Sequence, residues 1–409
     1  MSEAIVLGAG MVGVASALAL QARGHHVVLV DRREPGRETS YGNAGIIQAE
    51  AMEPYAMPLG LANLFAIAAR RTNDVNWHLG ALPGLARPLL AYFSHSFPAR
   101  HRIASAAYSQ MIRRATSDHA PLIAAAGADH LVARDGFRQA YRTAPRMEAA
   151  ITEAEYLKTE YGVGMRVLSP DLLSAEEPSL KRRMQGGIHW TEAWTCTDPG
   201  GLVAAYAGLF EARGGTIVHG DAMSLAQQGT AWSVASESGR IEAETAVVAL
   251  GPWSPQMLAR FGYRVPMLRK RGYHRHYRQT SALRQPFMDA ESGAVCSPMR
   301  LGLRIATGAE LAAFDAPATP RQLFHAEKRV GELFDLGEPV EAEPWLGNRP
   351  CMPDMLPVVG RAPDHPGLWL HFGHGHQGFT LGPTTANMLA DQITDGAETA
   401  LTAALAYRF

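Results

Sequence analysis

The strand, glycine-rich turn and helix that open this chain constrain its fold most. The segment IVLGAGMVGVASALALQARGHHVVLVD places Gly8, Gly10 and Gly13 in a GxGxxG pattern directly after a short apolar run, and Asp31 ends the next apolar run. We predict strands over residues 4–7 and 27–30 and a helix over residues 11–23, which Gly24 stops. A βαβ unit of this form is typical of a parallel sheet that binds a dinucleotide.

Each glycine of the turn has a mechanical reason. Gly8 permits the tight turn, Gly10 lets the backbone approach a pyrophosphate, and Gly13 lets helix and strand touch. The helix N-terminus then presents unpaired N–H groups to the anion. Asp31 is expected to accept hydrogen bonds from the ribose hydroxyls of an adenosine. Because Arg32 follows the acid, NADP is not excluded, and the motif alone does not distinguish FAD from NAD.

The same α/β rhythm returns later in the chain, at residues 202–219, 232–250 and 368–393, where the last helix is predicted from about residue 383. Between these segments, residues 54–180 read as mostly helical, with the clearest helices at 104–126 and 145–161, and residues 269–307 are rich in β-prone residues. The predicted fold is therefore α/β, with an α+β substrate part. A Rossmann-like dinucleotide domain of discontinuous segments (residues 1–53, 195–265 and 341–409) carries an inserted mixed-sheet domain (residues 54–194 and 266–340).

Composition excludes several classes of protein. Lys and Arg total 38 against 39 Asp and Glu, a balance that argues against a nucleic-acid partner and favours a small molecule. The three cysteines form no CxxC pair, so we expect no disulfide framework and no metal site. We see no signal peptide and no membrane-spanning stretch, and we expect a cytoplasmic protein. Peripheral contact with the inner face of a membrane is left open for residues 59–69 and 82–93, although we favour packing of both on the core.

Four further segments, in order and at their separations, carry a resemblance to a known family. They are TSYGNAG (39–45), VVALGPWSP (247–255), GNRPCMPDMLPVVG (347–360) and GHGHQGFTLGP (373–383). Together with GAGMVG and Asp31 they resemble the D-amino acid oxidase superfamily of FAD enzymes, with the closest likeness to its D-amino acid dehydrogenase branch. The resemblance spans nearly the whole chain and is weakest over residues 54–165.

The resemblance implies FAD as the cofactor. In such proteins the segment matching residues 373–383 is a turn against the flavin, and the helix that it opens directs its positive end at the N1 side of the ring, where a reduced flavin carries negative charge. Some relatives bind FAD covalently through a cysteine near Cys351, but we expect non-covalent FAD. The cofactor-binding residues expected are Gly8, Gly10, Met11, Val12, Gly13, Asp31, Arg32, Ser40, Asn43, Ala44, Gly45, Gly251, Gly373, His374, Gly378, Phe379 and Thr380.

The resemblance also implies the substrate end of the site. Arg349 matches the family's carboxylate-binding arginine, and its planar fork suits an α-carboxylate; the alternative is a structural arginine bonded to loop carbonyls. Tyr273 is expected near the flavin, where its hydroxyl completes the clamp or its ring is an ordinary strand aromatic. His376 is the better substrate-facing candidate of the two histidines in the turn, which could equally be hydrogen-bonded turn residues.

The implied reaction is oxidative deamination of a D-amino acid. Hydride leaves Cα for flavin N5, water hydrolyses the imine, and no general base is required if the amine binds neutral. Electrons are expected to pass to a quinone or another carrier. A close alternative is oxidation of a secondary amine such as D-hydroxyproline, sarcosine or an opine, and an alternative of another class is a non-catalytic flavoprotein subunit.

Overall fold

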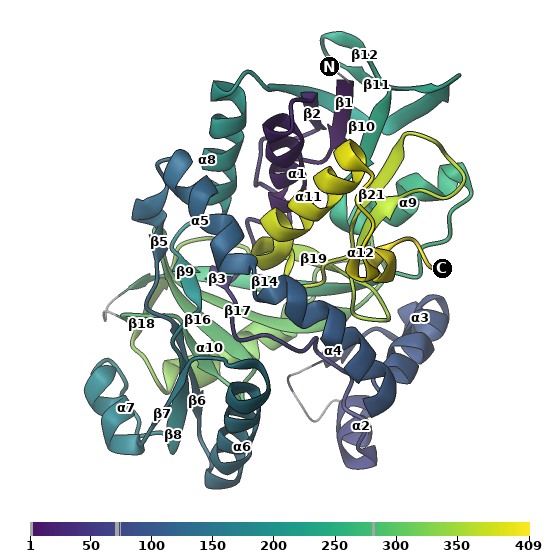
Figure 1. Cartoon of the computed structure of the whole chain (residues 1–409). Coiled ribbons are helices and arrows are strands. Elements are labelled where there is room, and N and C mark those ends of the chain that lie inside the picture. The colour runs from purple at the N-terminus through teal and green to yellow at the C-terminus, as the bar shows by residue number, and fades with distance from the viewer. Residues whose placement is uncertain (1–2, 70–72, 74, 280–282) are drawn as a thin grey trace.

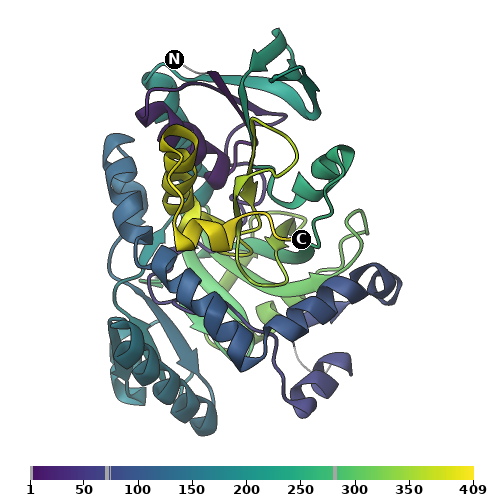
Figure 2. The same ribbon diagram turned by 45° about the vertical axis from the view of Figure 1, so that its right-hand side comes forward.

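The computed structural model describes residues 3–69, 73, 75–279 and 283–409. Figure 1 shows two large sheets, one above the other, with helices on their outer faces, and the turned view of Figure 2 shows the same two parts. A third, small sheet has three strands in the order β3 (Ile46–Ile47), β9 (Trp194–Cys196) and β5 (Val132–Ala133). Each large sheet is assembled from segments far apart in the sequence.

The upper sheet has eight strands in the order β12-β11-β10-β2-β1-β13-β21-β20. The five central strands are parallel to their neighbours, and β20 and the β11–β12 hairpin are antiparallel. Apolar residues fill these strands because both faces are covered. The strands are β1 (Glu3–Leu7), β2 (His26–Asp31), β10 (Thr216–Gln228), β11 (Ala231–Ser236), β12 (Gly239–Ala243), β13 (Thr245–Val248), β20 (Val358–Arg361) and β21 (Leu368–Phe372).

Helices from both ends of the chain cover one face of this sheet. The helix α1 (Met11–Ala22) follows β1 directly, and α11 (Gly378–Asp395) packs closely along it, with α8 (Pro199–Ala212) on the other side of α1. The helices α1 and α11 are buried over most of their length. The short helices α9 (Ser254–Leu258) and α12 (Ala400–Leu405) complete this part. Packing of α11 on α1 brings the last predicted motif beside the first.

The lower sheet has ten strands and is mixed. Its path is β18-β14-β17-β16-β15-β6-β8-β7, with β19 beside β14 and β4 beside β17. The strands are β4 (Val75–Trp77), β6 (Phe137–Tyr141), β7 (Met165–Leu168), β8 (Gly186–Trp190), β14 (Leu268–Gln279), β15 (Phe287–Asp289), β16 (Ala294–Met299), β17 (Gly302–Leu311), β18 (Leu336–Pro339) and β19 (Trp345–Cys351). The helices α6 (Ala144–Tyr161), α7 (Pro170–Glu176) and α10 (Arg321–Gly331) pack against it.

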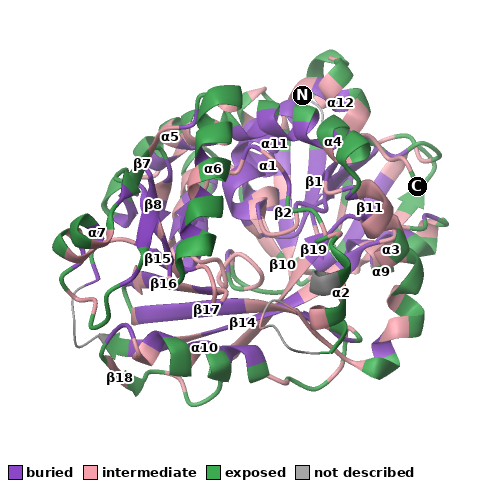
Figure 3. Cartoon of the chain, turned by 90° about the horizontal axis from the view of Figure 1, so that it is seen from below, coloured by how far each residue is buried: buried purple, intermediate pink, exposed green. Residues whose placement is uncertain are grey.

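Three sequence predictions about helices need correction. The helix expected over residues 104–126 is two helices, α4 (Pro98–Ile112) and α5 (Ala115–Ala125). The helix α11 begins at Gly378 rather than near residue 383, because Pro383 is accommodated inside its first turns. The expectation that residues 59–69 and 82–93 pack on the core holds only for one face of the second segment, where the buried Tyr92 packs with Leu268 and Cys351. The helices α2 (Leu61–Ala68) and α3 (Leu82–His95) leave Leu61 84% and Leu90 68% exposed, and Figure 3 shows α3 largely in the exposed and intermediate colours.

The division into domains stays a prediction, and two details bear on it. The strand β19, which the predicted boundary at residue 341 assigns to the dinucleotide domain, is hydrogen-bonded to β14 in the lower sheet. The helices α4 and α5, which the prediction assigns to the inserted domain, pack against α11 of the upper part. The two parts therefore share an extensive boundary rather than a single linker.

Candidate active site

A cavity of about 850 Å³ lies between the two sheets, and both contribute to its walls. It lies outside the carboxyl ends of the neighbouring strands β1 and β13. In this sheet β1 is followed by β2 on one side, and β13 is followed by β20 and β21 on the other. Open α/β sheets bind their ligands at such a switch point. The lining comes from the β1–α1 turn, residues 38–56, residues 249–253, β14, β19 and residues 371–379. Segments from the two ends of the sequence thus meet around one space.

The glycine turn has the geometry that its spacing predicts. Gly8 has a φ of +105°, and an added Cβ there would lie 2.6 Å from the Ala249 carbonyl oxygen. A Cβ on Gly13 would lie 1.7 Å from the Gly8 oxygen, so this glycine lets α1 touch β1. By contrast, a Cβ on Gly10 would meet Ser40 Oγ at 3.3 Å and would project into the cavity region that Gly10 lines. Gly8 and Gly13 are therefore required by the fold, and Gly10 by a ligand.

The polar groups around this turn are already ordered. Asp31 Oδ2 accepts a hydrogen bond from the Ala9 N–H at 2.6 Å, and Ser40 Oγ accepts one from the Met11 N–H at 2.9 Å. Arg32 lies 4.9 Å from the Trp253 ring centroid. These contacts hold an acid and a helix N-terminus at one end of the cavity, as recognition of a ribose and a pyrophosphate requires.

Residues 373–376 and 378 line the cavity beside the other helix N-terminus. Gly373 has a φ of +87°, the Gly375 N–H donates to the Pro350 oxygen at 2.9 Å, and α11 starts at Gly378. A Cβ on Gly382 would lie 2.7 Å from Met11 Cγ, so the first turns of α1 and α11 are in contact. Both helices therefore direct their positive ends at the cavity.

Three predicted cofactor residues do not line the cavity. Gly13 packs under Gly8, a Cβ on Gly45 would lie 2.2 Å from the Cys196 oxygen, and Thr380 Oγ1 accepts a hydrogen bond from the Gln48 N–H at 3.2 Å. They support the backbone that forms the walls. The other predicted cofactor residues line the cavity: Gly8, Gly10, Met11, Val12, Asp31, Arg32, Ser40, Asn43, Ala44, Gly251, Gly373, His374, Gly378 and Phe379.

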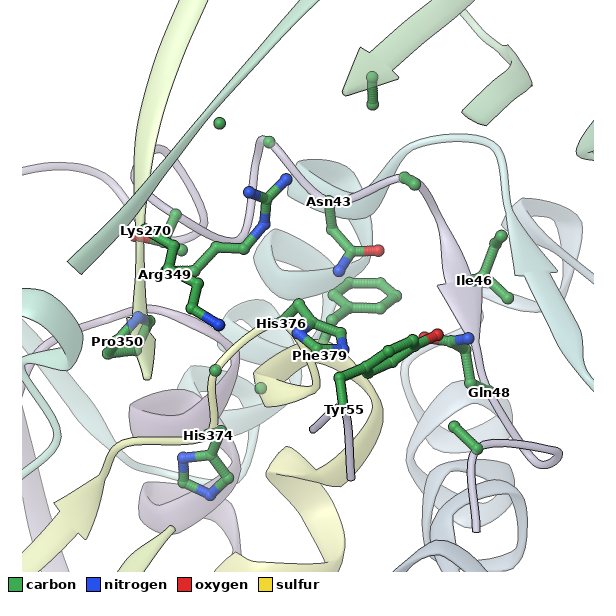
Figure 4. A pocket seen from close by; sticks show the side chains of 18 of the residues that line it. Asn43, Ile46, Gln48, Tyr55, Lys270, Arg349, Pro350, His374, His376 and Phe379 are labelled. Atoms are coloured by element: carbon green, nitrogen blue, oxygen red, sulfur yellow. The ribbon is translucent and has the colours of Figure 1, made fainter. Parts of the chain in front are cut away.

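The two histidines of the turn face different surroundings. His374 lines the cavity, but its ring bonds Thr385 Oγ1 at 3.0 Å and is directed away from the Arg349 guanidinium, as Figure 4 shows. The His376 ring lies beside Tyr55, with ring centroids 4.5 Å apart, and its buried Nε2 has no partner among the described residues. Burial, followed by the charges of Arg349 and Lys270, lowers the pKa of His376 to about 3, so the ring is neutral. His376 thus presents a neutral, unsatisfied imidazole near the cavity.

Arg349 enters the cavity from β19. Its guanidinium donates to the Gly308 carbonyl oxygen at 2.6 Å and lies over Gly272 of β14, where an added Cβ would be 2.5 Å from Nη2. The side chain extends into the cavity toward Asn43 (Figure 4), and burial lowers its pKa from 12.5. The structure thus combines both readings of this arginine, because one loop carbonyl orients the guanidinium and the rest of the fork is left for an anion.

The prediction that the Tyr273 hydroxyl completes a carboxylate clamp does not fit the structure. That hydroxyl donates to Glu310 Oε2 at 2.6 Å and accepts a hydrogen bond from the Thr319 N–H at 2.8 Å. Both partners, with Arg271, lie in a buried network on the side of β14 away from Arg349. Successive side chains of a strand point to opposite faces, so Lys270 and Gly272 share the face of β14 next to Arg349; Tyr273 also lines the cavity, but its hydroxyl is held in this network.

Several cavity residues escaped sequence reasoning. Glu50 is buried, its Oε1 accepts from Gln48 Nε2 at 2.6 Å, and burial raises the pKa of its carboxyl to about 7. Trp345 stacks on His274, with centroids 4.8 Å apart, and lines the cavity. Lys270 could have been found in the segment RKRGYHRHY, because a strand there places the side chains of Lys270 and Tyr273 on opposite faces. No sequence signal marked Glu50.

These features define a dinucleotide-binding oxidoreductase with a ligand cavity beside the cofactor cradle. A sequence model described as DAO, FAD dependent oxidoreductase, matches residues 3–392, and the chain belongs to this family. The cradle at Gly10, the acid Asp31 and the two helix ends at the cavity fit FAD.

The chain is similar over most of its length to curated relatives. It is 32% identical to a D-amino acid dehydrogenase of Cereibacter sphaeroides, across 95% of this chain and 91% of the relative. It is 30% identical to a D-amino-acid oxidase of Bradyrhizobium diazoefficiens, across 95% and 94%. Glycine oxidase from Bacillus cereus shares the fold, with a TM-score of 0.72 at 20% identity, across 100% of this chain and 99% of that chain. The predicted fold class and FAD dependence are confirmed.

Proposed function

We propose that this chain catalyses the oxidative deamination of D-amino acids. The observation that carries the proposal is Arg349, whose guanidinium enters the cavity beside the turn at residues 373–378. The two relatives above, a D-amino acid dehydrogenase and a D-amino-acid oxidase, support the substrate class. FAD supplies the acceptor for the hydride from Cα, and the imine product is hydrolysed by water.

The protein's contribution is orientation and electrostatics. Arg349 grips the α-carboxylate with two parallel hydrogen bonds and thereby fixes the position of Cα. His376, neutral and unsatisfied, contacts the substrate next to Tyr55 without adding a cation near its amine. No residue is assigned as a general base, since a substrate that binds with a neutral amine forms the imine with its own lone pair. The α11 N-terminus favours the negative charge that accompanies reduction.

We propose that FAD is held non-covalently. Cys351 is buried at the end of β19, pairs with His374 through the backbone, and is absent from the described cavity lining. Acid precipitation of the purified protein is expected to release all flavin into the supernatant. Flavin that stays with the pellet would contradict this assignment.

We further propose a quinone or another carrier as the electron acceptor, with cytoplasmic protein touching the inner face of the membrane. The support is the exposed apolar side chains of α2, α3 and α4, namely Leu61, Phe65, Leu90 and Ile103, together with the exposed Arg87 and Arg102 on the same helices α3 and α4. No helix among the described residues is long and apolar enough to cross a bilayer. We expect the wild-type protein to co-sediment with anionic vesicles and the variant with Leu61→Ser and Leu90→Ser to stay in the supernatant. Equal co-sedimentation of wild type and variant would contradict the proposed membrane contact.

The central experiment is anaerobic bleaching of the flavin by a panel of D-, L- and N-methyl amino acids, with wild type, Arg349→Ala and Arg361→Ala. Wild type is expected to be reduced by D-amino acids. Loss of two charge-assisted hydrogen bonds of about 1.5–3 kcal/mol each predicts a fall of ~10²–10⁴-fold in kcat/KM for Arg349→Ala. Arg361 is exposed, so its variant is the matched control.

Three outcomes would contradict the proposal. Kinetics of Arg349→Ala close to those of wild type, with FAD bound in both, would show that the carboxylate is gripped elsewhere. Reduction by N-alkyl amino acids but by no primary D-amino acid would favour the secondary-amine alternative, and no reduction by any amine would favour a non-catalytic subunit.

A further inference from the structure

Lys270 and Arg349 lie directly opposite each other in neighbouring strands. The antiparallel register of β14 and β19 pairs these two residues, and both side chains line the cavity. Directly opposite side chains in an antiparallel pair emerge on the same face, with Cβ atoms roughly 4.5–5.5 Å apart, and like charges there are destabilising. A fold keeps such a pair without cost only where an anion offsets the repulsion.

Within the described residues, no carboxylate neutralises either cation. Arg349 donates to a carbonyl oxygen, and the Lys270 ammonium lies 4.2 Å from the centroid of the Tyr92 ring. The opposite face of β14 shows the contrast, because the buried Arg271 forms an ion pair with Glu310 at 3.1 Å. One face of the strand thus satisfies its cation internally, and the cavity face leaves two cations for a ligand.

Two of the acids that line the cavity, Glu50 and Glu53, have other hydrogen-bond partners. Glu50 accepts its hydrogen bond from Gln48, and Glu53 accepts hydrogen bonds from the Tyr156 and Tyr161 hydroxyls at 2.8 Å. Burial keeps the Glu50 carboxyl toward its neutral form by raising its pKa to about 7. Neither carboxylate forms an ion pair with Lys270 or Arg349 among the described residues.

The heads of the two cations diverge. In Figure 4 the Arg349 guanidinium extends toward Asn43, whereas the Lys270 ammonium extends toward the turn that carries His374 and His376. Since the α-carboxylate occupies the guanidinium fork, the ammonium is left to meet a different part of the same ligand.

We propose that Lys270 binds a second carboxylate of the substrate, so that the preferred substrates are dicarboxylic. This inference rests on the proposed function, because it takes Arg349 as the site of the α-carboxylate. The second carboxylate belongs either to the side chain, as in D-aspartate and D-glutamate, or to a substituent on nitrogen, as in an N-(carboxyalkyl) amino acid. Lys270 is then a specificity-determining residue.

The experiment compares each diacid with its amide of nearly the same shape. D-glutamate is measured against D-glutamine, and iminodiacetate against its monoamide, with wild type, Lys270→Met, Lys270→Arg and the exposed-residue control Lys328→Met. In wild type, kcat/KM for at least one diacid is expected to exceed that for its amide by ~10–100-fold, the range of one charged hydrogen bond. Lys270→Met should remove this ratio by slowing the diacid alone, and Lys270→Arg should retain it.

The two pairs distinguish the sources of the second carboxylate. A preference for D-glutamate over D-glutamine alone assigns it to the side chain. A preference for iminodiacetate over its monoamide alone assigns it to the nitrogen substituent. Equal rates for both diacids and their amides in wild type would overturn the inference. An equal loss on diacid and amide in Lys270→Met would also overturn it, because Lys270 would then act on the shared α-carboxylate or on the fold.

A binding measurement separates this inference from the proposed function. Perturbation of the flavin spectrum by glutarate and by butyrate reports anion binding without turnover. Glutarate is expected to bind wild type at least ~10-fold more tightly than butyrate, and Lys270→Met to bind the two equally. If no amino acid reduces the flavin but this difference is observed, the proposed function fails and the dicarboxylate site stands. If glutarate and butyrate bind wild type equally, the dicarboxylate site fails whatever the turnover.

Discussion

Gly272→Ala tests whether the orientation of Arg349, rather than its charge alone, drives the reaction. The added methyl would lie 2.5 Å from Arg349 Nη2 and 2.7 Å from Cζ. An ordinary contact begins near 3.4 Å, so the guanidinium must shift by about 0.9 Å. The obstacle is the far end of a flexible side chain, and the fold should therefore tolerate the change. The charge stays in the cavity and only its position changes.

The expected size of the effect follows from that shift. A misplacement near 1 Å costs ~10²-fold in rate, which is about 2.7 kcal/mol of transition-state stabilisation. We expect kcat/KM for the best D-amino acid to fall by this factor, with the anaerobic rate of flavin reduction at saturation falling too. Flavin content and melting temperature should match wild type, since neither the cofactor cradle nor the core is changed.

The matched control is Gly208→Ala in α8, where an added Cβ meets nothing within 4 Å. It should leave kinetics and flavin content unchanged. If Gly272→Ala retains kcat/KM within threefold of wild type while FAD is bound, the argument that β14 positions the arginine is wrong. Loss of flavin in this variant would likewise refute it, because the effect would then act through the cofactor.

Three further changes test the cofactor cradle and the buried acid. Gly10→Ala should purify folded but colourless, because its Cβ meets only Ser40 Oγ at 3.3 Å yet blocks the approach to the pyrophosphate. Gly13→Ala should instead lower the melting temperature, because its Cβ would lie 1.7 Å from the Gly8 oxygen. A yellow Gly10→Ala protein would contradict the first expectation. The folded-state pKa of Glu50, about 7, lies above its ordinary 4.5, so stability falls as pH rises between these values. Glu50→Gln should therefore stabilise the protein by about 3 kcal/mol at pH 8 and hardly at pH 4.5, which thermal unfolding at both pH values measures; equal shifts would exclude this linkage.

The sequence by itself determined the cofactor end of this protein. Strand, turn and helix of the first βαβ unit depend on glycine spacing and apolar periodicity within about thirty residues, and those are local properties. The motif around Arg349 and the turn at residues 373–378 were likewise readable, because backbone close to a ligand admits few residue types. The start of α11 was missed only because Pro383 was taken to open the helix that it in fact continues.

The tertiary structure alone decided the substrate end. Whether the polar end of Lys270 or of Tyr273 is directed at Arg349 depends on the faces of β14, and pairing with β19, some eighty residues away, sets that. The helices α2 and α3 read as core from their composition, yet Leu61, Phe65 and Leu90 are exposed while Tyr92 is buried, because apolar content does not specify which surface is covered. Burial likewise gives Glu50 its raised pKa. Contacts between residues distant in sequence create these properties, and for that reason no local pattern announces them.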